Sequence, residues 1–575
     1  NRNTKNTDFN MRTKLYFSAA LATTLALSSC NKLGELSADN FTVTPSPLEA
    51  VSNQVPVTIN GRFPEKYMKK KAVVTVIPVL RYEGGEAVGQ SATFQGEKVQ
   101  ANNQEISYKV GGNYTMKNNF NYIDAMAESE LYLTFDAKVG KKTVKVPEVK
   151  VADGVIATST LLGDALAGAN GANAADAYQQ IIAQKQEAQI KYLINQAKVR
   201  SSELNSVSIK DFVKMLRDIK ADQKGLKLNN IEVSAYASPD GAYDFNEKLA
   251  EKRQGTSSDY VKSQLKSNKL TADIDRKYTA EDWDGFQQLV SASNLQDKEV
   301  ILRVLSMYQD PEEREKQIRN ISAAYNELAD EILPELRRAR ITLNYDIIGR
   351  TDDEIKQQYT DDASKLSVEE LLYAATLTGK DGRKDIYTRT TQLYPNDYRA
   401  YNNLAEIAYY EGNVAQAASY LSQAAAKKGG AAEVKANEAL VALAQGNAAK
   451  AEQALAGATT AKNYNELRGN LNIAKGNYAQ AAKDLAGVNT NSAALAQILS
   501  KDYTGAARTL AAVGKADATT SYLKAILAAR TNQSSTAISN LRDAIAKQPA
   551  YKARAARDLE FAALFDNSDF RSLMK

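Results

Sequence analysis

The hydrophobic and polar positions follow three different patterns along the chain. From residue 41 to about 155, short segments alternate apolar and polar residues, and turn-forming pairs such as Asn60-Gly61 separate them. The pattern predicts about six β-strands, at 41–43, 55–59, 72–80, 105–110, 130–135 and 142–151. Strands at this spacing are typical of an all-β sandwich of immunoglobulin-like type, predicted for residues 41–155. We interpret it as a spacer or interaction module, with sugar binding by Tyr114, Phe120 and Tyr122 as the alternative.

The middle of the chain mixes strand and helix patterns. Residues 156–188 are predicted to be a linker, rich in small residues at 165–175, that continues into a helical Gln- and Ala-rich stretch. An α/β domain is predicted for residues 189–350, with a first strand at 190–194 and a last strand at 339–345. Residues 209–219 form an amphipathic helix with Phe212, Met215, Leu216 and Ile219 on one face. A helical insertion at 278–335 contains the single tryptophan, Trp283, and a helix that begins at Asp310-Pro311.

The last pattern, at residues 351–575, is rich in alanine and repeats. Gly412-Asn413 and Gly446-Asn447 lie 34 residues apart, each between two helical segments. Small residues recur in the first helices (Ala405, Ala439, Gly469, Ala494, Ala525), and alanine followed four residues later by leucine recurs in the second helices (Ala417, Ala451, Ala481, Ala506, Ala537). Close helix crossings require such small side chains. The segment resembles an all-α tetratricopeptide-repeat solenoid, and an irregular helical bundle is the alternative.

In that family the first helices line a concave groove that binds peptides or partner proteins. The resemblance therefore implies partner binding at the corresponding positions, which are Arg399, Asn402, Glu406, Tyr409, Glu466 and Asn470. An ordinary solvated helix face is the alternative for about half of them.

The most specific local pattern lies within residues 231–253. Alternating residues at 231–236 predict a strand, Ser238-Pro239-Asp240-Gly241 a turn, and the following residues a helix. Asn246, Leu249 and Arg253 share one face of that helix because they are spaced by three and seven residues.

This strand, turn and helix resemble the core of the OmpA-like peptidoglycan-binding domain, whose N-x-x-L-[S/A]-x-x-R motif corresponds to Asn246 through Arg253. The resemblance implies that Arg253 binds a carboxylate of the peptidoglycan stem peptide, which a guanidinium matches with two parallel hydrogen bonds. The family has an aspartate three residues before the turn glycine, where this chain has Ser238, and Asp240 is the nearest acid. The predicted site is therefore Arg253, Asn246, Ser238 and Asp240, and a docking domain that binds no peptidoglycan is the alternative. The paired Arg337-Arg338 resembles the paired arginines at the family's final strand, and the helical insertion resembles the variant of this domain found in Bacteroidetes envelope proteins.

The amino-terminal residues resemble a bacterial lipoprotein signal. After Met11, a short basic region precedes an apolar run at 15–27, and Ser28-Ser29-Cys30 ends it. Residues 1–29 are predicted to comprise upstream residues and the signal peptide, and residues 30–40 a lipidated tether that begins at Cys30. A plain secretory signal is the alternative. The apolar run is shorter than the roughly 20 residues of a membrane span, so we expect no transmembrane helix there. The resemblance implies a lipid on Cys30 that anchors the chain in the outer membrane. Because residues 31–35 lack the acidic run that resembles a surface-export signal, we expect the protein to face the periplasm, with surface exposure as the other possibility.

Composition excludes several chemistries. The chain has no histidine and one cysteine, so His-based triads, Cys-His pairs and histidine metal sites are absent. Its 73 basic and 68 acidic residues leave a small net charge of +5, which is not the footprint of a nucleic-acid-binding protein. No cofactor or metal site is predicted.

These features predict a non-enzymatic outer-membrane lipoprotein scaffold that engages peptidoglycan through the OmpA-like domain and envelope proteins through the repeats. The alternative is an accessory or assembly subunit of an envelope secretion or uptake complex that binds no peptidoglycan. A glycan hydrolase with paired carboxylates among Asp240, Asp244, Glu281 and Asp282 is a third possibility, although no motif surrounds these acids.

Overall fold

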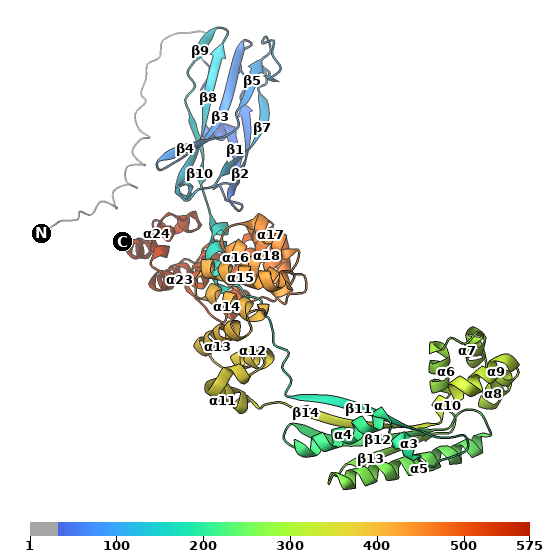
Figure 1. Cartoon of the computed structure of the whole chain (residues 1–575). Helices are drawn as coiled ribbons and strands as arrows, with labels where there is room; N and C mark the ends of the chain where they lie inside the picture. The colour runs from blue at the N-terminus through green and yellow to red at the C-terminus, as the bar shows by residue number, and fades with distance from the viewer. Residues whose placement is uncertain (1–32) are drawn as a thin grey trace. The chain divides into compact units, whose positions relative to one another are not determined.

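The computed structural model describes residues 33–575, so the predicted signal peptide and Cys30 lie outside the described residues. The chain divides into two compact units (Figure 1): the first runs to Ala174 and resumes at Tyr394, and the second is Ala175–Leu393. Among residues 33–575, no helix has both the length and the apolar character needed to cross a membrane.

The first unit begins with two antiparallel-rich β-sheets that share one hydrophobic core, as the alternating pattern predicts. One sheet has the order β1-β2-β7, with β1(Phe41–Thr44), β2(Gln54–Phe63) and β7(Gly112–Asn121). The other has the order β10-β8-β3-β5-β6, with β10(Val149–Gly154), β8(Ser129–Val139), β3(Ala72–Tyr82), β5(Ala92–Gly96) and β6(Gln104–Ile106), while β4(Gly85–Val88) and β9(Lys142–Val144) pair with β3 and β8. Val55, Val57 and Ile59 of β2 are buried because alternate side chains face the second sheet. Tyr114 and Phe120 are buried in the same core, so they form no exposed sugar-binding platform.

The residues after this β domain do not form a free linker. They make three short turns of helix, η3(Thr158–Leu161), α2(Leu162–Ala165) and η4(Leu166–Gly168), and then run without regular structure to Ala174. Leu161, Leu166 and Ala169 are buried in one hydrophobic cluster with the helices of the C-terminal repeats. We call residues 156–174 the connecting segment. The prediction of a linker at this place is therefore wrong, because the segment is part of a core.

The C-terminal helices of the first unit form successive antiparallel hairpins, in agreement with the predicted repeats. The pairs are α14(Tyr398–Tyr410) with α15(Val414–Lys428), α16(Ala432–Ala444) with α17(Ala448–Leu455), α18(Tyr464–Ala474) with α19(Tyr478–Asp484), α20(Asn491–Leu499) with α21(Tyr503–Ala512), and α22(Ala518–Arg530) with α23(Ser534–Lys547); α24(Ala550–Arg557), η7(Leu559–Leu564) and α25(Ser568–Met574) follow. Gly412 and Gly446 have φ values of +77° and +73°, which suit glycine at the turn between paired helices. A Cβ atom at Gly469 would lie 2.4 Å from Cγ of Leu485, so α18 and α19 cross as closely as the small-residue pattern indicates.

The second unit contains a four-stranded sheet with the order β11-β14-β12-β13. Its strands are β11(Ile181–Lys191), β12(Leu226–Tyr236), β13(Asp273–Thr279) and β14(Arg338–Ile348), and α4(Val207–Ala221) and α5(Tyr243–Ser267) pack on it beside the short α3(Ser201–Leu204) (Figure 1). β12 and β13 are parallel because α5 connects them as a crossover helix. Ile209, Phe212, Leu216 and Ile219 of α4 are buried against the sheet, which confirms the predicted helix face.

Three expectations for this unit differ from the structure. The stretch expected to be helical before the domain is the edge strand β11, which pairs with β14 over its whole length, so the domain begins earlier than residue 189. Residues 273–279 form a strand that the sequence pattern did not reveal. The repeats are predicted to begin at residue 351, but α11(Asp352–Asp362), α12(Val368–Thr376) and α13(Lys380–Leu393) belong to this unit.

The predicted helical insertion is present and has a hydrophobic core of its own. It consists of α6(Trp283–Ala292), α7(Lys298–Met307), α8(Pro311–Arg319), α9(Ser322–Glu327), a π-helical turn at Leu328–Ile332 and α10(Leu333–Leu336). Phe286, Val290 and Leu333 are among the buried residues that form its core. The side chain of Asp310 caps α8 by accepting a hydrogen bond from the backbone N–H of Glu313, as the Asp-Pro pair predicts.

Candidate functional site

The turn and helix that resemble a peptidoglycan site bring Arg253 into the interior of the second unit. Only 1% of its surface is exposed. Its Nε donates a hydrogen bond to the carbonyl of Gln196 (2.9 Å), Nη1 to that of Tyr236 (2.9 Å) and Nη2 to that of Leu193 (3.2 Å). Burial lowers the pKa of Arg253 to about 10. The guanidinium therefore joins two backbone segments, the loop at 193–196 and the end of β12, and in this conformation it faces no open cleft.

The neighbouring predicted residues also bind within the chain. Asp240 forms an ion pair with Nη2 of Arg337 at 3.2 Å and accepts a hydrogen bond from the hydroxyl of Ser238. Asn246 donates from Nδ2 to the carbonyls of Ser238 (3.2 Å) and Gly241 (3.3 Å), and so it closes the turn.

The inserted helices cover the same turn. Oε1 of Glu315, on α8, accepts a hydrogen bond from the backbone N–H of Gly241 at 3.0 Å. The space between the turn and the core of the insertion is a cavity of about 10 Å³ lined by Pro239, Trp283 and Leu328 among others, which is room for about one water molecule. The structure thus gathers the four predicted residues, but Asp240 and Ser238 bind Arg337, and Asn246 and Arg253 bind backbone carbonyls. Peptidoglycan binding stays a prediction, and in this conformation the turn has no room for a ligand.

The groove of the helical repeats is occupied by the connecting segment. Figure 1 shows this segment, in teal, among the orange and red helices of the first unit. Its residues 170–174 cross α18, α16 and α14 in that order, and each of these first helices contributes asparagine or glutamate side chains to the contact. The connecting segment therefore lies where the tetratricopeptide resemblance places a peptide ligand.

Asparagine side chains pair with the main chain of this segment at every second residue. The N–H of Ala172 donates to Oδ1 of Asn437, and Nδ2 of Asn437 donates back to the Ala172 carbonyl, both at 2.8 Å. Asn403 forms the same pair with Ala174, at 2.8 and 3.0 Å, and Asn402 donates a further hydrogen bond to the Ala172 carbonyl at 2.8 Å. A side-chain amide carries a donor and an acceptor, as a backbone unit does. The two asparagines therefore reproduce the hydrogen-bonding pattern of a neighbouring β-strand.

Acidic side chains hold the asparagines of the segment. Glu466 accepts hydrogen bonds from the backbone N–H of Asn170 (3.0 Å) and from its Nδ2 (2.8 Å), and burial raises the pKa of Glu466. Glu406 accepts from Nδ2 of Asn173 at 3.1 Å. The hydroxyl of Tyr409 donates to the carbonyl of Leu166 at 2.6 Å. Of the predicted groove residues, Asn402, Glu406, Tyr409 and Glu466 thus bind this chain's own segment.

The two remaining predicted groove residues behave differently. Arg399 forms an ion pair with Asp397, 2.8 Å away at the start of α14. Asn470 lies one helical turn after Glu466 and is fully buried, and neither its Nδ2 nor its Oδ1 has a hydrogen-bond partner among the described residues.

Sequence reasoning missed several groove residues, above all Asn403 and Asn437. Asn463, which donates to the carbonyl of Asn170 at 2.7 Å, and Tyr410, whose hydroxyl accepts from the N–H of Gly171 at 2.8 Å, were missed as well. A signal for the first two was present, because Asn403 and Asn437 are 34 residues apart and therefore share one position of the repeat.

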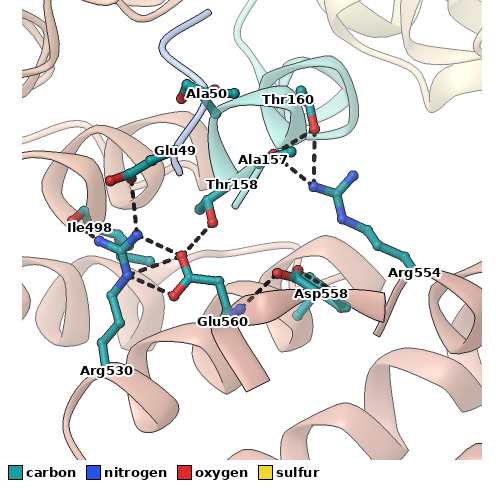
Figure 2. Close-up of polar contacts among 12 residues, drawn as sticks. Glu49, Ala50, Ala157, Thr158, Thr160, Ile498, Arg530, Arg554, Asp558 and Glu560 are labelled. Carbon is teal, nitrogen blue, oxygen red and sulfur yellow. Dashed lines mark hydrogen bonds and ion pairs between the residues drawn. The ribbon is translucent and has the colours of Figure 1, made fainter. Parts of the chain in front are cut away.

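A polar network joins the repeats, the connecting segment and the β domain at the other end of the groove (Figure 2). Arg530 of α22 contacts Glu560 at 2.6 Å and Glu49 of the β domain at 3.5 Å. The Glu560 carboxylate also accepts a hydrogen bond from the hydroxyl of Thr158. Nη2 of Arg554 donates to the carbonyl of Ala157 at 3.0 Å. The start of the connecting segment is therefore fixed by charged groups, whereas its end is fixed by amide pairs.

Comparisons with known proteins add no assignment for the whole chain. No protein-family model matches the sequence, and no curated protein matches it. Among solved structures, a tetratricopeptide repeat protein from Parabacteroides merdae is similar over 37% of this chain and 91% of its own, with 12% identity and a TM-score of 0.28. PilF of Pseudomonas aeruginosa (20% identity, TM-score 0.26) and the type IV pilus biogenesis factor PilW (15% identity, TM-score 0.26) are each similar over 37% of this chain and 99% of their own. Because these TM-scores are low, the description of the repeats rests on the helices themselves.

No group of three or more acidic or cysteine residues in the described part of the chain could hold a metal ion.

Proposed function

We propose that this protein is a non-enzymatic scaffold of the cell envelope, anchored in the outer membrane by a lipid on Cys30, and that it serves as an accessory or assembly subunit of an envelope protein complex. The observation that carries the proposal is a repeat groove that binds a peptide main chain through Asn403 and Asn437. An asparagine amide can pair with the N–H and C=O of an extended chain whatever its side chains are, because it carries one acceptor and two donors. The groove therefore supports a role in holding polypeptides together.

The position of the second unit within the sequence supports the same role. The chain leaves the first unit at Ala174 and returns to it at Tyr394. Asn403 of α14 binds Ala174, so the first unit holds the point of departure next to the helix that follows the point of return. The second unit, which contains the α/β domain, is thus inserted in the sequence of the first, as suits a module presented to other proteins.

The proposal does not include peptidoglycan binding. In the structure each nitrogen of the Arg253 guanidinium donates to a backbone carbonyl, and Asp240 is paired with Arg337. A ligand carboxylate would have to displace three internal hydrogen bonds, each made by a charged donor and worth about 1.5–3 kcal/mol. This cost favours a docking role for the α/β domain.

The test is crosslinking in cells followed by affinity purification of the full-length protein, compared with a Cys30→Ala variant. We expect crosslinks to envelope proteins, and we expect the variant to lose them together with its membrane association. A second assay mixes the soluble Cys30→Ala protein with isolated peptidoglycan sacculi. The proposal fails if the protein sediments with the sacculi and free diaminopimelic acid competes, because the α/β domain would then be a cell-wall module.

A further inference from the structure

We propose that the groove over α14, α16 and α18 is a peptide-binding site that residues 169–174 occupy in cis, and that it takes in trans an extended peptide with small side chains from a partner protein. The inference deepens the scaffold function proposed above and rests on it. It gives residues 169–174 a role beyond connection, as a built-in competitor for the partner peptide.

The contacts define the kind of peptide that fits. Ala172 and Ala174 are 5% and 1% exposed and are held through their backbone N–H and C=O groups, so the site reads the main chain and leaves room only for small side chains. A Cβ atom on Gly171 would lie 2.8 Å from Cγ of Glu406, which favours glycine there. Glu466 accepts two hydrogen bonds from Asn170, which favours asparagine or another donor at that position. The expected ligand is an extended stretch of the Ala-Asn-Gly-Ala type.

The two halves of the connecting segment are held by different forces. The first half is anchored by the buried side chains of Leu161 and Leu166 and by Arg554, which binds the Ala157 carbonyl. Residues 169–174 contribute only alanine, glycine and asparagine, so they bury little apolar surface and are held mainly by hydrogen bonds. Because a hydrogen bond contributes little net free energy when water can replace it, this half can leave the groove while the anchor stays in place.

Asn470 shows that the cis segment does not use the whole groove. Its amide is fully buried and has no hydrogen-bond partner among residues 33–575, and leaving such a group unpaired destabilises the fold. Before Ala169 the segment turns into η4, so it presents no extended main chain at this point. A peptide that stayed extended past α18 would offer the backbone groups that this amide lacks.

The test measures how often residues 169–174 leave the groove and whether a peptide traps the open state. In the full chain with Cys30→Ser, which removes the single native thiol, Ala172→Cys places a thiol at a buried position and Ala167→Cys places one at an exposed position of the same segment. The probe is a synthetic peptide of residues 166–177, LAGANGANAADA. Trapping of the open state multiplies the labelling rate by one plus the ratio of peptide concentration to its dissociation constant.

We expect about 1 mM peptide to accelerate maleimide labelling of Ala172→Cys at least about five-fold, for a dissociation constant near 0.2 mM. Labelling of Ala167→Cys should not change. A control peptide with proline at the positions of Ala172 and Ala174 lacks the two N–H donors and should give no acceleration. Hydrogen exchange of residues 166–177 in the unmodified protein provides a second readout, and the peptide should speed it likewise.

Three results would overturn the proposal. The first is a labelling rate that does not respond to the peptide. The second is equal acceleration by the proline peptide, because the amide pairs would then play no part. The third is a dimer in which residues 169–174 are exchanged between two copies, because the groove would then take its own segment and no separate partner. Loss of in-cell crosslinks would instead count against the scaffold function itself, so the two failures are distinguishable.

Discussion

Two buried asparagines on neighbouring first helices allow a matched test of how the groove is held together. Asn437 and Asn470 are 3% and 0% exposed and lie on α16 and α18. Asn437 donates to and accepts from Ala172 and donates to Asn402, whereas Asn470 has no partner among the described residues. Leucine has the same number and branching of side-chain heavy atoms as asparagine but no polar atoms. The same substitution at the two positions should therefore change stability in opposite directions.

The magnitudes follow from the hydrogen bonds. Asn437→Leu removes three of them and leaves the N–H of Ala172 buried without an acceptor, while the Ala172 carbonyl keeps its bond from Asn402. An unpaired buried group costs about 1–3 kcal/mol and each of the two further lost bonds about 1 kcal/mol, so we expect the free energy of unfolding to fall by about 3–5 kcal/mol. Asn470→Leu removes an amide that is already unpaired, so we expect a gain of about 1–3 kcal/mol.

The assay is urea denaturation of the full-length variants with two probes. Far-UV circular dichroism reports the helices of both units, and the fluorescence of Trp283, the single tryptophan, reports the second unit alone, so the part of the dichroism change that the tryptophan does not share follows the repeats. The transition seen by dichroism should move to lower urea for Asn437→Leu and to higher urea for Asn470→Leu, while the tryptophan transition stays in place. The reasoning is refuted if Asn470→Leu destabilises the repeats as much as Asn437→Leu does, or if Asn437→Leu changes the free energy of unfolding by less than about 0.5 kcal/mol.

Three further predictions concern single side chains. Arg253→Met should destabilise the second unit by about 2–4 kcal/mol because three backbone carbonyls lose their donor. The control variant Arg276→Met, on the exposed strand β13, should change the stability of this unit by less than about 0.5 kcal/mol. Urea titration of the tryptophan fluorescence measures both effects, and equal effects would contradict an internal role for Arg253. Burial raises the pKa of Glu466, so the Glu466 carboxyl keeps its proton to a higher pH in the folded state than in the unfolded state. The wild type should therefore lose stability relative to Glu466→Gln as the pH rises from about 4 to 7. A constant difference in the free energy of unfolding between the two proteins across this range would show that burial does not perturb Glu466. Gly469→Ala should destabilise the repeats by about 1–3 kcal/mol through overpacking. Gly430→Ala is the control, because a Cβ atom at Gly430 meets nothing within 4 Å. The thermal midpoints of the two variants test this, and equal midpoints would refute a close crossing of α18 and α19.

Elements whose sequence pattern reflects local chemistry were predicted correctly, and elements that depend on long-range pairing were missed. Gly412 and Gly446 end first helices and Gly469 lies at a close helix crossing, and in each case one residue type meets a local steric requirement. The strand at 181–191 was missed because its first seven residues are polar or exposed and carry no alternation. Pairing with β14, which follows more than 140 residues later, makes it a strand.

The candidate sites show the same division. The motif that ends in Arg253 correctly indicated a turn packed against a helix, but a sequence motif does not reveal whether an arginine faces solvent. Long-range contacts with the carbonyls of Leu193 and Gln196 decided that it is internal. The groove positions were predicted from the repeat, whereas their occupant lies more than 220 residues earlier in the chain and has the composition of a linker.

The sequence by itself determined the series of elements: the alternating strands of a β-sandwich, an α/β domain with a helical insertion, and helical hairpins of about 34 residues. These follow from periodicity and turn chemistry, which act over a few residues. The tertiary structure decided which parts of the chain fill or cover the predicted sites. The connecting segment fills the repeat groove, and the insertion covers the turn beside Arg253. Such contacts join residues far apart in the chain, and their free energy depends on whether buried polar groups form hydrogen bonds. A local sequence pattern does not contain this information.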